Sequence, residues 1–405
     1  MPRILLALLF ITQWNFTFTP VPQTSAQVND THVSYQFGES VRFDAEIQSD
    51  QPIQEVYVFM QAAGESTRLG KMTANDGNRF AYREDLSQHP MRPFSRIYYW
   101  FRITDSSGKE TTSPSFWFDY QDNRFTWQTL ENALFRVHWA DGDTAFGQTL
   151  MSAAQDGLAS IQQNLPLTLN QTPLDIFVYK SSSDLQSALQ LAGQSWVAGY
   201  ASPDLGVIMV SIPNGPEARM EAERQIPHEM THVMLYQATG SGYASLPAWL
   251  VEGTASMAEL SPNPDYPRTL EAARKSSSLL PMSSLCQSFP RDASNAFLAY
   301  AQSESFVRYL HKNYGTTGMQ ALIDQYLNGV GCVQAPAALW NLSLDEMDSR
   351  WQKDSLGINV NTIRWINLAP YFLLAVILLV VPLALSLRTR RTRQPAAPLP
   401  EGTAK

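Results

Sequence analysis

The chain is poor in charge, histidine and cysteine for its length. Of its 405 residues, 16% are Asp, Glu, Lys or Arg, six are histidine and two are cysteine. The formal net charge of -8 argues against nucleic acid as a partner, because nucleic-acid-binding proteins present basic surfaces. The sequence also lacks a nucleotide-binding glycine loop, a heptad run and an obvious repeat, so none of these offers a competing functional site.

Both ends of the chain carry patterns that predict targeting or membrane segments. Near the N-terminus, Arg3, a short apolar run and the sequence TSA at 24–26 predict a signal peptide over 1–26, with an uncleaved anchor as the alternative. Residues 365–387 contain no charge and are long enough to predict a single transmembrane helix, with a buried core helix as the alternative. The arginine-rich segment 388–405 then predicts a cytoplasmic tail by the positive-inside rule. The domains between these segments are therefore expected outside the cytoplasm.

The two cysteines, Cys286 and Cys332, both lie in the part predicted to be extracytoplasmic. An even count in an oxidising compartment favours a disulfide between them. Neither cysteine lies at a metal-ligand spacing or near a histidine, which argues against a nucleophile or a metal ligand. We interpret both as structural.

Residues 227–259 read PHEMTHVMLYQATGSGYASLPAWLVEGTASMAE and contain the strongest chemical pattern in the chain. His228 and His232 lie four residues apart, so on a helix their imidazoles share one face and can reach the same ion. Glu229, between them, stands where a general base for a metal-bound water belongs. The alternative is an amphipathic helix whose histidines only pack.

A catalytic zinc site takes three protein ligands and leaves one position for water, so a third ligand must come from elsewhere. Glu252, twenty residues after His232, lies in a second helical stretch introduced by Ser245 and Pro247. Glycines at 240 and 242 can end the first helix and reverse the chain. Two helices joined in this way bring Glu252 towards both histidines.

These residues, HEMTH followed by WLVEG, resemble the gluzincins, and more narrowly the bacterial peptidase MA-like proteins. The resemblance covers residues 125–355, including the later stretch AYAQSESFVRYL. It implies an α+β zincin-type peptidase domain with Zn2+ on His228, His232 and Glu252. It also implies that Glu229 polarises the attacking water and passes its proton to the leaving amine.

One position departs from the gluzincin pattern. Many gluzincins have an aspartate four residues after the glutamate ligand, whereas Ser256 stands there in this chain. A ligating imidazole usually donates its other N–H to an acceptor, so this departure removes an expected partner of His228 or His232. Glu259, about one turn further along, is the predicted substitute.

Peptide hydrolysis also needs a donor that stabilises the oxyanion, often a tyrosine or histidine. Tyr300 is the candidate catalytic residue for this role, because its predicted helix follows the site and it shares a face with Ala296 and Val307. The alternatives are a core tyrosine at this position and His311 as a weaker donor candidate, expected at the surface. Trp249, close to Glu252 in sequence, is interpreted as a packing residue rather than part of a substrate pocket.

Residues 27–121 predict an immunoglobulin- or fibronectin-like β-sandwich domain. Short stretches rich in aromatic and β-branched residues alternate with turns, and no helical period is present. The predicted strands are 33–37, 41–47, 56–60, 97–103 and 116–120. Tyr98, Tyr99, Trp100 and Trp117 are interpreted as core or inter-strand packing, and the domain as either a binding module or a spacer.

Residues 122–360 predict the peptidase domain. The order is a strand at 134–139, a helix at 144–165, a strand at 174–179, a helix at 183–192 and a strand at 206–212. The last of these strands, with the preceding WVAGYASPD, is predicted to form the sheet edge above the cleft, where an extended peptide can pair with it; an interior strand is the alternative. Later helices, expected at 270–277, 295–313, 318–327 and 344–353, would close the cleft from below.

The sequence therefore predicts a single-pass, membrane-anchored zinc metallopeptidase. It would hydrolyse peptide bonds of surface or secreted proteins, and its partners would be a peptide or protein substrate and the membrane. The alternatives are a non-catalytic surface adhesion or partner-binding protein with a relict metal site, and another zinc-assisted hydrolysis such as deacylation. The intact Glu229 argues against the relict site, because a structural metal needs no base.

Overall fold

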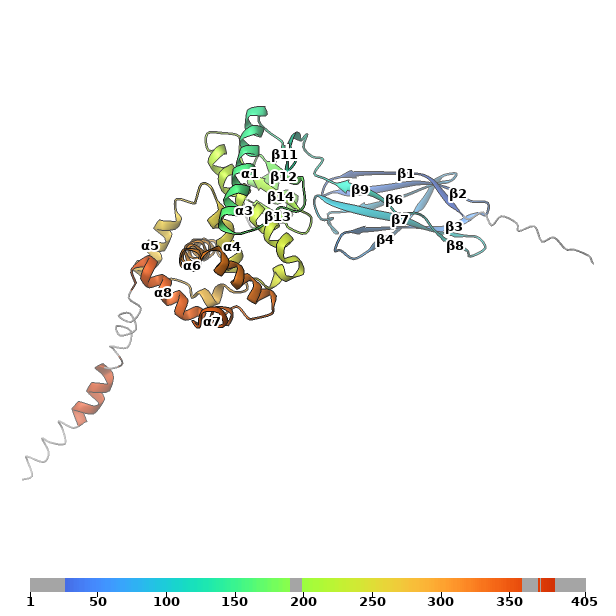
Figure 1. Cartoon of the computed structure of the whole chain (residues 1–405). Coiled ribbons are helices and arrows are strands. Elements are labelled where there is room, and N and C mark those ends of the chain that lie inside the picture. The colour runs from blue at the N-terminus through green and yellow to red at the C-terminus, as the bar shows by residue number, and fades with distance from the viewer. Residues whose placement is uncertain (1–25, 190–198, 359–370, 372, 383–405) are drawn as a thin grey trace, which may run out of the picture. The chain divides into compact units, whose positions relative to one another are not determined.

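The computed structural model describes residues 26–189, 199–358, 371 and 373–382, which belong to two compact units divided between Thr126 and Trp127 (Figure 1). The predicted signal peptide, apart from Ala26, and the predicted tail at 388–405 lie outside the described residues. Only part of the predicted membrane span at 365–387 is described. Among the described residues, no helix has both the length and the apolar character needed to cross a membrane.

The described part of the first unit is built from strands alone. They are β1 (Gln27–Gln36), β2 (Ser40–Gln48), β3 (Ile53–Ala62), β4 (Arg68–Lys71), β5 (Thr73–Asp76), β6 (Arg79–Asp85), β7 (Ser95–Asp105), β8 (Glu110–Thr112) and β9 (Phe116–Tyr120). One sheet has the order β1-β2-β6-β5, and the other has the order β4-β3-β7-β8 with β9 also paired to β7. The predicted all-β character of this unit is confirmed.

Alternating side chains hold the two sheets together. Every second residue of β2 and β7 is buried, and Phe43 of one sheet contacts Tyr99 of the other with ring centroids 5.2 Å apart. The sheets therefore pack face to face as a sandwich. Core packing explains Tyr99, whereas Tyr98 and Trp117 pair across strands on the outer face, where they are 44% and 54% exposed.

The second unit begins with a five-stranded sheet. Its strands are β10 (Gln128–Glu131), β11 (Phe135–Trp139), β12 (Leu174–Tyr179), β13 (Gly199–Ser202) and β14 (Val207–Ser211), in the order β10-β11-β12-β14-β13. The three central strands, β11, β12 and β14, run parallel, and the two outer strands are antiparallel to their neighbours. The predicted edge position of 206–212 is wrong, because β14 pairs on both sides and β13, from the preceding segment, forms the edge.

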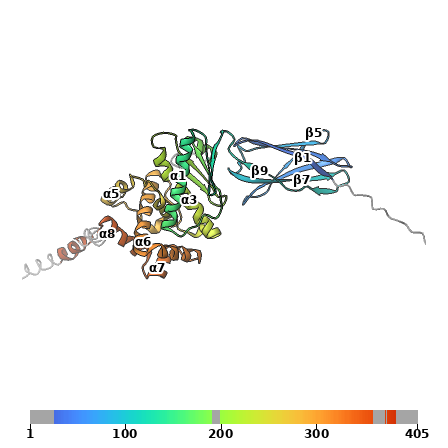
Figure 2. The ribbon, with the colours of Figure 1, turned by 45° about the horizontal axis from the view of Figure 1, so that its top comes forward.

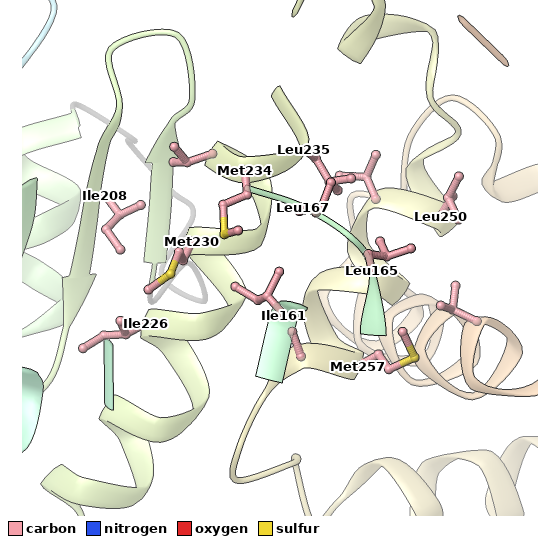
Figure 3. Packing of buried hydrophobic residues seen from close by; sticks show 14 of the residues in the cluster. Ile161, Leu165, Leu167, Ile208, Ile226, Met230, Met234, Leu235, Leu250 and Met257 are labelled. Atoms are coloured by element: carbon pink, nitrogen blue, oxygen red, sulfur yellow. The ribbon is translucent and has the colours of Figure 1, made fainter. Parts of the chain in front are cut away.

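The described helices of this unit pack against the sheet or follow it in the chain (Figure 2). They are α1 (Thr144–Asn164), α2 (Ser182–Leu189), α3 (Ala218–Thr239), α4 (Ala248–Ala258), α5 (Tyr266–Ser276), α6 (Ala293–Leu327), α7 (Ala335–Trp340) and α8 (Leu344–Leu356), with short 3-10 turns η1 (Gly240–Ser245) and η2 (Met282–Leu285). Met230 and Met234 project from α3 into a buried cluster that also holds Ile208 of β14 and Ile161 of α1 (Figure 3). This core fixes α3 against the sheet.

Pro227 lies inside α3, and the helix continues through it. Proline has no N–H to donate, so the carbonyl of Glu223, four residues earlier, loses its partner within the helix. That carbonyl accepts the N–H of Leu260 at 2.9 Å, just beyond the end of α4. Gly157 of α1 makes room for the proline ring, since a Cβ there would lie 2.6 Å from Pro227 Cγ. The proline thus links α3 to the segment that carries Glu259.

The predicted disulfide is confirmed between Cys286 and Cys332, which are 46 residues apart in sequence. The carbonyl of Cys286 accepts the N–H of Ala248 at 2.9 Å, in the first turn of α4. The cross-link therefore connects the segment after α6 to the start of the helix that carries Glu252.

Replacing both cysteines, Cys286→Ser with Cys332→Ser, is expected to lower the free energy of unfolding by about 2–4 kcal/mol, because the loop between them becomes free in the unfolded chain. Urea unfolding of the wild-type and the double variant measures this difference. Wild-type protein unfolded in reducing buffer should match the variant. Equal stability of all three samples would show that the cross-link contributes nothing.

Candidate metal centre

Three side chains with metal-binding atoms meet between α3 and α4. His228 and His232 lie one turn apart on α3, with ring centroids 5.2 Å apart. Glu252 of α4 places its Oε2 3.4 Å from His228 Nε2 and 3.7 Å from His232 Nε2. The structure therefore brings all three predicted ligands together.

The approach of α4 depends on small residues in the chain reversal and in the helix itself. Helix α3 ends at Gly240, whose φ of 56° lies in the left-handed region that favours glycine. After η1 the chain enters α4 at Pro247. A Cβ on Gly253 would lie 2.4 Å from the carbonyl oxygen of Ser303, so this glycine lets α4 pack directly on α6. Glu252, its neighbour, is held towards the histidines by that contact.

The geometry fits a zinc ion. Zinc bonds of about 2.0–2.1 Å in a tetrahedron place neighbouring ligand atoms about 3.3–3.4 Å apart. The two distances to Glu252 lie within a few tenths of an ångström of that separation, and all three ligand atoms lie within 4.8 Å of one another. Two imidazoles and one carboxylate also form a donor set that zinc uses in catalytic sites.

Glu259 holds the first histidine. Its Oε1 lies 3.0 Å from His228 Nδ1, and its side chain is buried. A carboxylate at this nitrogen accepts the Nδ1–H and leaves the Nε2 lone pair free to bind a metal beside Glu252. The acceptor that the gluzincin pattern would place at position 256 is thus supplied by Glu259, as the sequence predicted.

Tyr243 is the partner of His232, and no pattern in the sequence predicted this contact. Its hydroxyl lies 3.0 Å from His232 Nδ1, and its ring contacts Tyr236 at a centroid distance of 5.8 Å. Burial, followed by the charges of Glu252 and Glu229, raises the pKa of Tyr243, so the phenol stays protonated. Its oxygen can accept the Nδ1–H of His232, which again leaves the Nε2 lone pair free to bind a metal.

Tyr243→Phe is expected to weaken zinc binding by about 10- to 100-fold, because His232 loses the partner that fixes its ring. Competition with a chromogenic chelator measures the zinc dissociation constant directly. Tyr236→Phe is the matched control, since it removes a hydroxyl from the neighbouring ring, and among the described residues that hydroxyl has no hydrogen bond to His232. Equal zinc affinity in the wild-type protein and Tyr243→Phe would assign Tyr243 to packing alone.

Glu229 lies beside the three ligand side chains and is 8% exposed. Burial, the largest influence, raises the pKa of Glu229 to about 7, while the charge of His228 and the backbone N–H of Ala201 act to lower it. The edge strand β13 passes directly over the carboxylate: a Cβ on Gly199 would lie 2.3 Å from Glu229 Oε1. Glycine at 199 is therefore what allows the strand to lie against this carboxylate.

Tyr300 of α6 faces the same site. Its ring centroid lies 6.3 Å from that of His228. Burial raises the pKa of Tyr300 well above its usual value, and the charges of Glu252 and Glu229 add to the shift. The phenol of Tyr300 is therefore a hydrogen-bond donor close to His228. Trp249, by contrast, is fully buried against Phe306 and packs in the core, as the sequence predicted.

A cleft of about 300 Å³ opens beside these groups. His228, Glu229 and Tyr300 line it at the site, and Arg224 and Phe297 line it further along. A molecule from outside can therefore reach these buried side chains through the cleft.

Comparisons with solved structures show only weak likeness. The Br derivative of BhCBM56 is 12% identical with a TM-score of 0.18, covering 22% of this chain and 88% of that one. OgpA from Akkermansia muciniphila is 13% identical with a TM-score of 0.20, covering 24% of this chain and 29% of that one. BC0361, a polysaccharide deacetylase from Bacillus cereus, is 10% identical with a TM-score of 0.21, covering 49% of this chain and 65% of that one. At such TM-scores the likeness supports no conclusion about this chain.

No curated protein matches the chain. The model of the Peptidase MA superfamily matches residues 153–356, just over half of the sequence. The matched region contains His228, His232, all of α4 and Tyr300. The chain belongs to the Peptidase MA superfamily.

Proposed function

We propose that this protein is a zinc-dependent peptidase of the gluzincin type that hydrolyses peptide bonds of surface or secreted proteins. The observation that supports the proposal most is the meeting of His228, His232 and Glu252 beside the buried carboxylate of Glu229. Membership of the Peptidase MA superfamily supports a peptidase-like function.

His228, His232 and Glu252 would hold the zinc ion. When bound, zinc acts as a Lewis acid on the substrate carbonyl and lowers the pKa of water in the site. The protein's own contribution is to fix the donor atoms before the metal arrives. Glu259 and Tyr243 do this for the two histidines, and the contact between Gly253 and α6 does it for Glu252.

Glu229 is the general base and then the general acid in this proposal. Its carboxylate takes a proton from the attacking water and returns it to the nitrogen of the leaving amine, so the peptide bond breaks without releasing an unstable amide anion. Tyr300, kept protonated, donates a hydrogen bond to the carbonyl oxygen as negative charge develops there. The edge strand β13 lies over the same carboxylate and supports pairing with an extended peptide.

The proposal includes a membrane anchor at 365–387 with the tail at 388–405 in the cytoplasm. The charge-free length of the first segment and the arginines of the second support it. The Cys286–Cys332 disulfide supports an extracytoplasmic site, because disulfides persist in oxidising compartments. Protease digestion of intact cells tests it: a tag after Lys405 should be protected and the peptidase unit should be cut. The reverse pattern would contradict this orientation.

Removal of the metal tests the activity. Treatment of the full chain with 1,10-phenanthroline is expected to abolish cleavage of a mixed peptide library, and added zinc should restore it, because the ligand set without metal has no Lewis acid. Mass spectrometry of the library before and after treatment measures both the cleavage and its sequence preference. Cleavage that persists in protein shown to be free of zinc would refute metal dependence. Stoichiometric zinc without any cleavage would favour the relict site of an adhesion protein.

A further inference from the structure

Five aromatic side chains lie on the outer surface of one sheet in the first unit. They belong to β3, β7 and β9, and both β3 and β9 pair with β7. Alternation places Val56 and Val58 in the core, so Tyr57 and Phe59 face outwards from the same strand. We call the outward set the aromatic face; its members are Tyr57, Phe59, Tyr98, Trp100 and Trp117.

Strand register makes the aromatic face continuous. Phe59 pairs with Trp100 across β3 and β7, and Tyr98 pairs with Trp117 across β7 and β9. The rings of Phe59 and Trp100 stack with centroids 5.5 Å apart and planes 9° apart. Tyr98 and Trp117 remain about half exposed to solvent, at 44% and 54%. The face therefore offers ring surfaces to a ligand instead of burying them.

Two arginines lie over rings of the aromatic face, and Arg102 differs from Arg96 in having no acidic partner among the described residues. Arg96 lies over Trp117 at 3.9 Å and pairs with Asp119 at 2.8 Å. Arg102 lies over Phe59 at 5.0 Å and over Tyr57 at 5.7 Å. Within the part of the chain that the structure describes, the Arg102 guanidinium has neither a hydrogen bond nor an ion pair. Five N–H donors are thus available on a half-buried cation.

We infer that the aromatic face binds an acidic polysaccharide. Pyranose rings present flat C–H surfaces that stack on exposed aromatic rings such as Tyr98 and Trp117. A carboxylate on a neighbouring sugar would accept two parallel hydrogen bonds from Arg102, the geometry that guanidinium groups favour. The aromatic face lies in the first unit, whereas the residues of the metal centre belong to the second.

The charges on this surface favour an acidic polysaccharide over single-stranded nucleic acid and over a protein partner. Single-stranded nucleic acid is held by a groove of several unpaired basic side chains. Here Lys71 pairs with Glu55 and Arg96 with Asp119, which leaves Arg102 as the one unpaired cation of this surface among the described residues. Protein interfaces have cores depleted of charge, whereas charged side chains alternate with these rings. A polymer of sugar rings with spaced carboxylates matches the pattern best.

Affinity gel electrophoresis of the purified full chain tests the inference. Gels contain polygalacturonate or hyaluronate as acidic polymers, or dextran as the neutral one, and single-stranded DNA is tested in solution. We expect retardation in at least one acidic polymer and none in dextran or by DNA. Absence of retardation in both acidic polymers would overturn the inference, as would equal binding to dextran or tighter binding to DNA.

Variants locate the binding surface. Tyr98→Ala combined with Trp117→Ala is expected to weaken binding at least tenfold, and Arg102→Gln should do the same with the ring surfaces intact. Arg83→Gln is the matched control, because this exposed arginine of β6 lies on the other sheet and contacts Ser40. Circular dichroism checks that each variant is folded. If the double variant does not fold, Arg102→Gln alone tests the inference. Wild-type affinity in folded Arg102→Gln would overturn the inference.

Discussion

Glu229→Gln is expected to lower kcat for peptide cleavage by about 10²- to 10⁴-fold while zinc remains bound, the range typical for loss of a general acid–base group. Glutamine has nearly the shape of glutamate and still offers a carbonyl oxygen to the backbone N–H of Ala201. It cannot take a proton from water. The loss should therefore lie in the chemical step, with little change in metal content or stability.

Measurement of kcat, KM and zinc content on the same preparation separates the outcomes. Glu223→Gln is the matched control, because this glutamate lies on the same helix and pairs with Arg219 at the surface. Its activity should equal that of the wild-type protein. Unchanged cleavage by Glu229→Gln would remove Glu229 from the mechanism, and loss of zinc together with activity would show a structural role instead.

Glu252→Ala is expected to weaken zinc binding by more than about 100-fold and to abolish cleavage. Loss of a hydrogen-bond partner of a ligand typically costs 10- to 100-fold in metal affinity, and loss of the ligand itself should cost more. Only two imidazoles would remain at the site, too few for a stable catalytic zinc.

Chelator competition on Glu252→Ala and Glu259→Gln gives a graded test. Glu259→Gln keeps all three ligands and changes only the group that accepts from His228 Nδ1, so its zinc affinity should fall less. Thermal unfolding of the metal-free proteins shows whether either change disturbs the fold. Retention of tight zinc by Glu252→Ala would exclude Glu252 as a ligand.

Local patterns in the sequence predicted the centre of the site well. The spacing of His228 and His232 places them on one face of any helix. The glycines after α3 predict a chain reversal that brings Glu252 back towards them. Glu259 was predicted from the same helical period, although it lies one residue beyond the end of α4. These residues were predictable because short-range geometry determines where they point.

Contacts that depend on tertiary structure were not predictable in the same way. Tyr243 reaches His232 from an irregular turn eleven residues later, where no period fixes the side-chain direction. The edge strand β13 is four residues long, and β5 is fully exposed, so neither has the apolar alternation that marks a strand. Strand β7 carries aromatic residues on both faces, and only the second sheet decides that Tyr99 is buried and Tyr98 exposed.

Anomalous diffraction at the zinc edge, from crystals of the zinc-loaded protein, can show whether side chains of α3 and α4 hold a single ion. We expect one strong peak bonded to His228 Nε2, His232 Nε2 and a carboxylate oxygen of Glu252, with Glu229 adjacent but not coordinated. A peak elsewhere, or zinc on the two histidines with Glu252 directed away, would contradict it.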